Sequence, residues 1–130
     1  MIKKTIPLLV VGLLLIILVG VACTSTEAEL VGKWQGNYQG DEIIMEFSKD
    51  GQFKMIVDPD EASGTYTLDT TKDPIWIDLT IEYGEGFEEN ETILTILEFI
   101  DEDTLRLQNN FAGEPRPESF TEDTLTMTRQ

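Results

Sequence analysis

The sequence predicts an all-β domain, a small antiparallel up-and-down β-barrel of about eight short strands, preceded by an N-terminal hydrophobic segment. The strongest observation is the stretch Ile75–Tyr83, whose alternate residues are all apolar. This strict period of two is typical of a half-buried strand. Short stretches of this kind recur after Leu30, with turn residues between them and without a helical pattern. Their meander order favours a closed barrel, because closure removes the exposed edges that apolar strands would otherwise present.

The predicted strands follow one another along the chain with polar turns between them. They are Leu30–Gln39, Asp41–Ser48, Gln52–Val57, Gly64–Asp69, Ile75–Tyr83, Thr92–Ile100, Thr104–Asn109 and Phe120–Arg129. Longer connections are predicted at Asp58–Ser63 and at Asn110–Glu118, which is rich in Pro and Gly. The strand Thr92–Ile100 is apolar on both faces, which predicts that both faces are covered. The inward set is bulky, so we expect little free space inside the barrel: Phe47, Phe53, Met55, Tyr66 and Leu79.

The N-terminal segment has the parts of a secretory signal. Lys3 and Lys4 form a positive region, an apolar run continues to Ala22, and the only cysteine of the chain, Cys23, comes next. The arrangement resembles a bacterial lipoprotein signal, which is removed before a Cys whose thiol receives a diacylglycerol. Gly20 stands where lipoproteins usually have Leu or a similar residue. The alternative is an uncleaved transmembrane anchor, although the apolar run is slightly shorter than the roughly 20 residues of a membrane span.

These features predict three parts of the chain. A signal peptide is expected at residues 1–22, a short polar tether at 23–29 and the barrel domain at 30–130. With a lipid on Cys23, the domain would be held at a membrane of the bacterial cell envelope, facing outside the cytoplasm. An uncleaved transmembrane anchor would likewise hold the domain outside the cytoplasm.

The charge and the residue types of the chain exclude several functions. It has 25 acidic and 9 basic residues, and without Lys3 and Lys4 the net charge of the remainder is −18. Such a surface repels phosphate backbones, so we expect no nucleic-acid partner. The chain has no His and no cysteine after Cys23, which excludes Ser–His–Asp and Cys–His catalysis and disfavours zinc. The acidic runs lack the spacing of a calcium loop, so we expect no metal, no cofactor and no enzymatic activity.

Several short patterns resemble one known family. Gly32-Lys33-Trp34 is similar to the Gly-x-Trp signature of the lipocalin and calycin superfamily. Lys72–Asp78 and Gly113–Pro117 match the Lys-x-Pro-x-x-Ile-Asp stretch and the Gly-x-x-Arg-Pro loop of a lipocalin-like family of uncharacterised bacterial proteins, abundant in planctomycetes. The resemblance covers most of Leu30–Arg129 and implies a lipocalin-like barrel. It implies no activity, and at Leu94–Ile96 the chain lacks the Gly-Ile-Tyr that the family often has.

Four residues of the body are candidates for a ligand site or a barrel end. Trp34 could line a ligand cavity or plug one end of the barrel, and Tyr66 belongs to the inward set. Trp76 lies opposite the apolar face of its strand, so it is expected either at the surface as a contact residue or under a loop. Arg116 lies between two prolines and would form either an anion clamp at the barrel mouth or an ion pair to Asp69 or Asp78.

Two functions fit these expectations. The first is a non-catalytic, membrane-anchored lipoprotein that binds a small apolar or amphiphilic ligand in a barrel. The second is a protein-interaction or envelope-assembly module with an envelope protein as its partner and a filled barrel. In either case the chain itself is expected to be a monomer.

Overall fold

A computed structural model describes residues 25–130 of the chain. The predicted signal or anchor at residues 1–22 and the predicted lipidation site Cys23 lie outside these residues. Within residues 25–130, no helix has the length and apolar character needed to cross a membrane.

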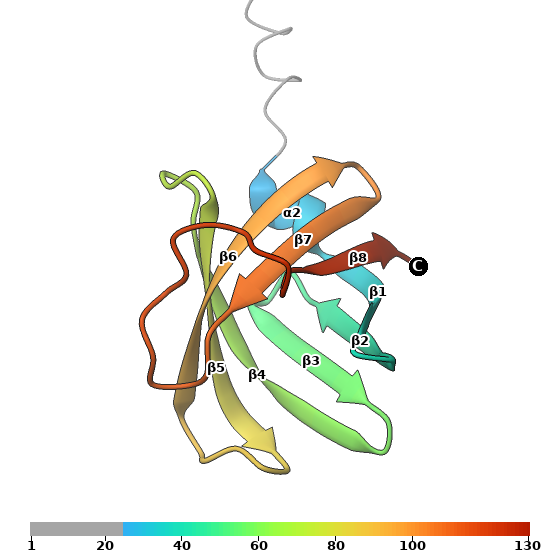
Figure 1. Ribbon diagram of the computed structural model, residues 1–130, viewed down its shortest axis with the longest axis vertical. Coiled ribbons are helices and arrows are strands. Elements are labelled where there is room, and N and C mark those ends of the chain that lie inside the picture. The colour runs from blue at the N-terminus through green and yellow to red at the C-terminus, as the bar shows by residue number, and fades with distance from the viewer. Residues whose placement is uncertain (1–24) are drawn as a thin grey trace, which may run out of the picture.

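The described part of the chain is an eight-stranded antiparallel barrel, as predicted (Figure 1). The strands are β1 (Gly32–Tyr38), β2 (Asp41–Phe47), β3 (Gln52–Val57), β4 (Asp60–Asp69), β5 (Ile75–Gly84), β6 (Glu91–Asp101), β7 (Thr104–Asn109) and β8 (Leu125–Arg129). Each strand pairs with the next one along the chain, and β8 pairs with β1 to close the barrel. Because the ring is closed, neither terminal strand presents a free edge.

A short helix, α2 (Thr26–Leu30), precedes the first strand, where a polar tether was predicted. The helix begins at an N-cap, Ser25, whose hydroxyl oxygen accepts a hydrogen bond from the Ala28 N–H at 3.1 Å. Its last residue, Leu30, is fully buried in the barrel core. Residues 26–29 of the predicted tether are therefore helical, and the apolar side chain of Leu30 docks this turn onto the barrel.

Alternation along the strands sets the core, as the sequence predicted. The fully buried apolar side chains include Trp34, Ile77, Leu97, Leu105 and Met127, which come from β1, β5, β6, β7 and β8. Cross-strand register places them side by side, since Leu97 lies opposite Leu107 and Leu105 lies opposite Met127. Charged residues take the outward positions, as in the Lys54–Glu61 ion pair at 3.1 Å on β3 and β4.

One predicted inward residue points outward. Tyr83 is 66% exposed, although Ile81 on the same strand is buried. The register of β4 and β5 shifts at this point, because Gly64 pairs with Ile81 while Ser63 pairs with Tyr83. The extra residue of this β-bulge reverses the faces of the strand beyond it. Strand β4 also begins at Asp60, inside the stretch predicted as a loop.

The outer face of β6 is covered at Ile96, as its apolar composition predicted, whereas Ile100, predicted on the same face, is 54% exposed. Ile96 points away from the barrel interior, opposite Trp76 of β5, and is only 1% exposed. The cover is the long segment between β7 and β8, residues 110–124, which crosses the outside of the barrel over β5 and β6 (Figure 1). Strand β8 is consequently shorter than predicted and begins at Leu125.

Candidate functional site

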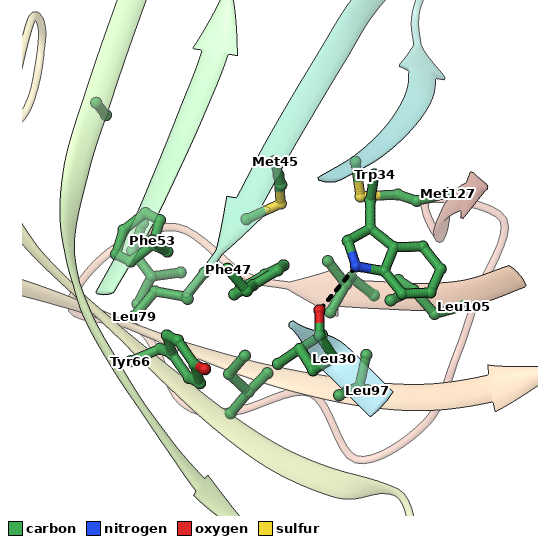
Figure 2. Close-up of a cluster of buried hydrophobic side chains, with 14 of the residues drawn as sticks. Leu30, Trp34, Met45, Phe47, Phe53, Tyr66, Leu79, Leu97, Leu105 and Met127 are labelled. Atoms are coloured by element: carbon green, nitrogen blue, oxygen red, sulfur yellow. Dashed lines mark hydrogen bonds between the residues drawn. The ribbon is translucent and has the colours of Figure 1, made fainter. Parts of the chain in front are cut away.

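One end of the barrel is sealed by α2 and Trp34 (Figure 2). The indole Nε1–H of Trp34 donates a hydrogen bond to the Leu30 carbonyl oxygen at 2.9 Å, which satisfies a helix-end acceptor inside the core. The guanidinium of Arg129 lies 4.2 Å from the centre of the Trp34 ring. The same guanidinium donates to the carbonyl oxygens of Glu29 at 2.6 Å and Val31 at 3.0 Å. Trp34 therefore has the position of a barrel-end plug, one of the two placements that the sequence left open.

Tyr66 also lies at the sealed end. Its ring meets Phe47 edge-on, with the ring centres 5.3 Å apart, and its hydroxyl donates to the Ser48 carbonyl oxygen at 2.6 Å. Burial raises the pKa of the Tyr66 phenol above its usual value, and the nearby carboxylate of Glu27 on α2 adds to that rise. These contacts make Tyr66 a structural link between the core and the turn after β2.

The opposite end of the barrel opens into a cavity of about 460 Å³. Its deeper wall is apolar and comes from five strands: Met45, Phe53, Met55, Leu79, Ile93 and Leu107. This finding corrects the expectation that bulky inward residues leave little space. Phe47 and Tyr66 fill the sealed half of the barrel. Phe53, Met55 and Leu79 instead line the cavity in the open half.

One polar side chain is buried in this apolar wall. Thr95 lies at an inward position of β6, between Ile93 and Leu97, and is 2% exposed. Its hydroxyl oxygen has no hydrogen-bond partner among residues 25–130. A buried hydroxyl without a partner is unfavourable, and this oxygen has almost no accessible surface toward the cavity.

The rim of the cavity carries aromatic and acidic groups. Tyr38 ends β1, and Phe111, which is 83% exposed, is the second residue of the crossing segment 110–124. Glu114 and Asp123 of the same segment also line the opening. Among the described residues, no Lys or Arg contributes to the lining. The opening is therefore negative, and an apolar interior lies behind it.

The crossing segment is fixed to the outer wall by Arg116. Its guanidinium forms an ion pair with Asp78 of β5 and donates to the Thr95 carbonyl oxygen at 2.7 Å. It also lies 4.5 Å from the ring centre of Trp76, and the Lys72 ammonium lies 4.7 Å from the same ring. Arg116 thus pairs with Asp78, as one of the two alternatives proposed, but on the outside of the barrel rather than at its end.

Asp69, the other proposed partner of Arg116, has different contacts. The Thr71 hydroxyl donates to its carboxylate at 2.5 Å and the Thr71 N–H at 3.1 Å. These hydrogen bonds hold the pKa of Asp69 below its usual value, with smaller contributions from Lys72 and Arg116.

A second attachment fixes the far end of the crossing segment. Gln108 is buried on the outer face of β7, where its amide accepts from the Thr121 N–H and from the Thr124 hydroxyl, both at 2.7 Å. Its NH₂ group donates to the Thr121 hydroxyl at 2.8 Å. With both ends attached, the segment presents its rim residues from a fixed backbone.

The structure separates the four predicted site residues from the cavity. Trp34 and Tyr66 lie at the sealed end, Trp76 and Arg116 lie on the outer wall, and none of them lines the opening. The lining residues that the sequence reasoning missed include Thr95, whose signal was a polar residue at an inward position of an apolar strand. Asp123 and Phe111 gave no signal, because they lie in irregular chain whose path depends on Arg116 and Gln108.

Comparisons with protein-family models, with curated proteins and with solved structures give no match to this chain. The function is therefore inferred from the geometry of the barrel.

Proposed function

We propose that the protein is a non-catalytic binding protein whose barrel holds a small apolar or amphiphilic molecule. The observation that carries this proposal is the cavity of about 460 Å³ at one end of the barrel. Ligand pockets in proteins have volumes of about 300–1,000 Å³ and mostly apolar walls with a few polar groups. The wall around Met55, Leu79 and Leu107, with Thr95 as its buried polar member, has this composition.

The way the barrel is closed supports the same proposal. Leu30 and Trp34 fill the sealed half and are joined by a hydrogen bond, so they close the end of the barrel opposite the cavity. Arg116 and Gln108 hold the rim segment in place from outside, so the opening exists without a ligand. A preformed pocket lowers the ordering cost of binding. The alternative, a protein-interaction module, was predicted together with a filled barrel, so the cavity favours the binding proposal.

The proposal includes the place of the protein in the cell. We propose that Cys23 carries a lipid and holds the barrel at a membrane of the bacterial envelope, outside the cytoplasm. Its support is the signal-like segment of the sequence before Cys23. Labelling of cells with radioactive palmitate would mark the wild-type protein and not Cys23→Ala. Equal labelling of the two would overturn the lipid anchor and leave the cavity proposal standing.

A direct binding test uses the barrel domain and the neutral fluorescent dye N-phenyl-1-naphthylamine. The dye is expected to gain fluorescence on titration, with one dye per protein by native mass spectrometry. Ile93→Trp fills the cavity and is expected to abolish the gain. Ile100→Trp, on the same strand but at an exposed position outside the cavity, is the matched control and should bind as the wild type does.

Circular dichroism of both variants establishes that they remain folded. A wild-type protein that leaves the dye unaffected would overturn the proposed function. An Ile93→Trp protein that stays folded and binds normally would also overturn it, because the dye would then bind elsewhere.

A further inference from the structure

The charge of the ligand can be inferred from the rim of the cavity. Of the lining residues, the two that carry a charge at neutral pH are Glu114 and Asp123, both carboxylates. Neither takes part in an ion pair within residues 25–130, so no Lys or Arg of the described chain offsets their charge at the opening. Two unpaired carboxylates beside an apolar opening favour a cation and repel the carboxylate of a fatty acid.

The backbone that carries these two carboxylates is held by neighbouring hydrogen bonds. Glu114 lies two residues before Arg116, and its N–H donates to the Phe111 carbonyl oxygen at 3.0 Å. Asp123 lies between Thr121 and Thr124, the residues that bind Gln108, and its own N–H donates to the Thr121 hydroxyl at 3.2 Å. The two charges therefore belong to the rim itself.

Aromatic rings at the same opening add to the preference for a cation. Tyr38, Phe87 and Phe111 contribute to the lining near the mouth. The face of an aromatic ring attracts a positive charge, and rings grouped with carboxylates are the chemistry that binds alkylated ammonium groups. An anionic or neutral head group would make no use of these rings.

The wall behind the rim suits the apolar part of such a ligand. Met55, Leu79, Ile93 and Leu107 line it, and all four side chains are apolar. An apolar body can therefore fill the cavity while its charged end stays at the mouth.

We propose that the ligand is a cationic amphiphile, with an amine or quaternary ammonium group at the rim carboxylates Glu114 and Asp123 and an apolar body in the cavity lined by Leu79 and Leu107. This inference rests on the proposed function and specifies its ligand class. A chain with a net charge of −18 after its first 22 residues would attract such a cation from a distance as well.

The test is competition against bound N-phenyl-1-naphthylamine by decyltrimethylammonium and decanoate, each below its critical micelle concentration, and by decanol below its solubility limit. The three share one apolar chain and differ in the charge of the head group. The ammonium compound is expected to bind about three- to tenfold more tightly than decanol, the advantage that a pair of exposed charges provides. Decanoate is expected to bind most weakly, and the ammonium advantage should shrink in high salt.

Paired variants locate the effect. Glu114→Gln with Asp123→Asn should bring the ammonium compound and decanol to equal affinity, with dye binding retained. The matched control, Glu118→Gln with Glu122→Gln, removes two exposed acidic residues of the same segment that do not line the cavity, and it should keep the preference. Equal displacement by all three decyl compounds, or a preference that survives in the rim variant, would overturn the cation inference while the proposed function stands. Failure of the dye to bind would overturn both.

Discussion

Replacement of Thr95 by Val tests the idea that the cavity wall contains an unfavourable polar group. The two side chains have nearly the same shape and both are β-branched, so the change removes the hydroxyl and leaves the packing of β6 unaltered. A buried hydroxyl without a partner costs about 1–3 kcal/mol in proteins. Thr95 is 2% exposed and its hydroxyl is unpaired within residues 25–130, so the full cost applies to the empty barrel. We expect Thr95→Val to raise the free energy of unfolding by at least about 1 kcal/mol.

The assay is thermal and urea unfolding of the ligand-free protein, followed by circular dichroism. For a domain of this size, a gain of that amount corresponds to a rise of about 4 °C in Tm. Thr92→Val is the matched control on the same strand, since the Thr92 hydroxyl is exposed and lies 3.1 Å from the Thr80 hydroxyl. Its change should stay within about 0.5 kcal/mol. A Thr95→Val protein that unfolds at or below the wild-type Tm would refute the reasoning, because the hydroxyl would then be satisfied in the empty barrel.

Three further predictions concern the frame around the cavity. Gly64→Ala should lower the free energy of unfolding by about 3 kcal/mol in urea unfolding, since a Cβ there would lie 1.8 Å from the Thr80 carbonyl oxygen; a change near zero would contradict the tight bulge. The pKa of the Tyr66 phenol is raised in the folded protein, so the unfolded chain loses this proton at lower pH than the folded one. Wild-type stability should therefore fall above about pH 10, and Tyr66→Phe should remove this fall. Equal pH profiles of the two proteins above that pH would be the contrary result. Arg116→Ala should cost about 3 kcal/mol because it leaves Asp78 and a carbonyl oxygen unpaired, and limited proteolysis should then cut the segment 110–124 first; an uncut segment would argue against its attachment by Arg116.

The barrel could be predicted from the sequence because strand alternation is a local property. In Ile75–Tyr83 each residue's face follows from its neighbours, and the prediction was wrong only at Tyr83, where a bulge against Gly64 reverses the faces. A bulge depends on the partner strand, which no single stretch of sequence specifies. The short helix α2 was missed for a similar reason, since Leu30 is helical only because it docks into the core.

The cavity could not be predicted because its volume is a small difference between two large volumes, that of the barrel interior and that of the side chains inside it. The same bulky side chains, Phe47 and Phe53 among them, can fill one end of a barrel or line the other, and only their axial positions decide which. The ligand-site residues proposed from sequence, Trp34 and Trp76, were chosen for size and polarity. The structure uses the first to close the barrel floor and the second to support a loop.

The docking of α2 determines which way the mouth of the cavity would face if the protein were anchored through Cys23. Thr26 begins the helix at the sealed floor, and only a few residues separate it from Cys23, a reach of roughly 10 Å even when fully extended. If acyl chains sit on that sulfur, the floor rests against the lipid surface and the mouth points to the water on the far side. In that orientation the cavity opens away from the membrane. The protein would then exchange ligands with the surrounding aqueous phase rather than with the bilayer.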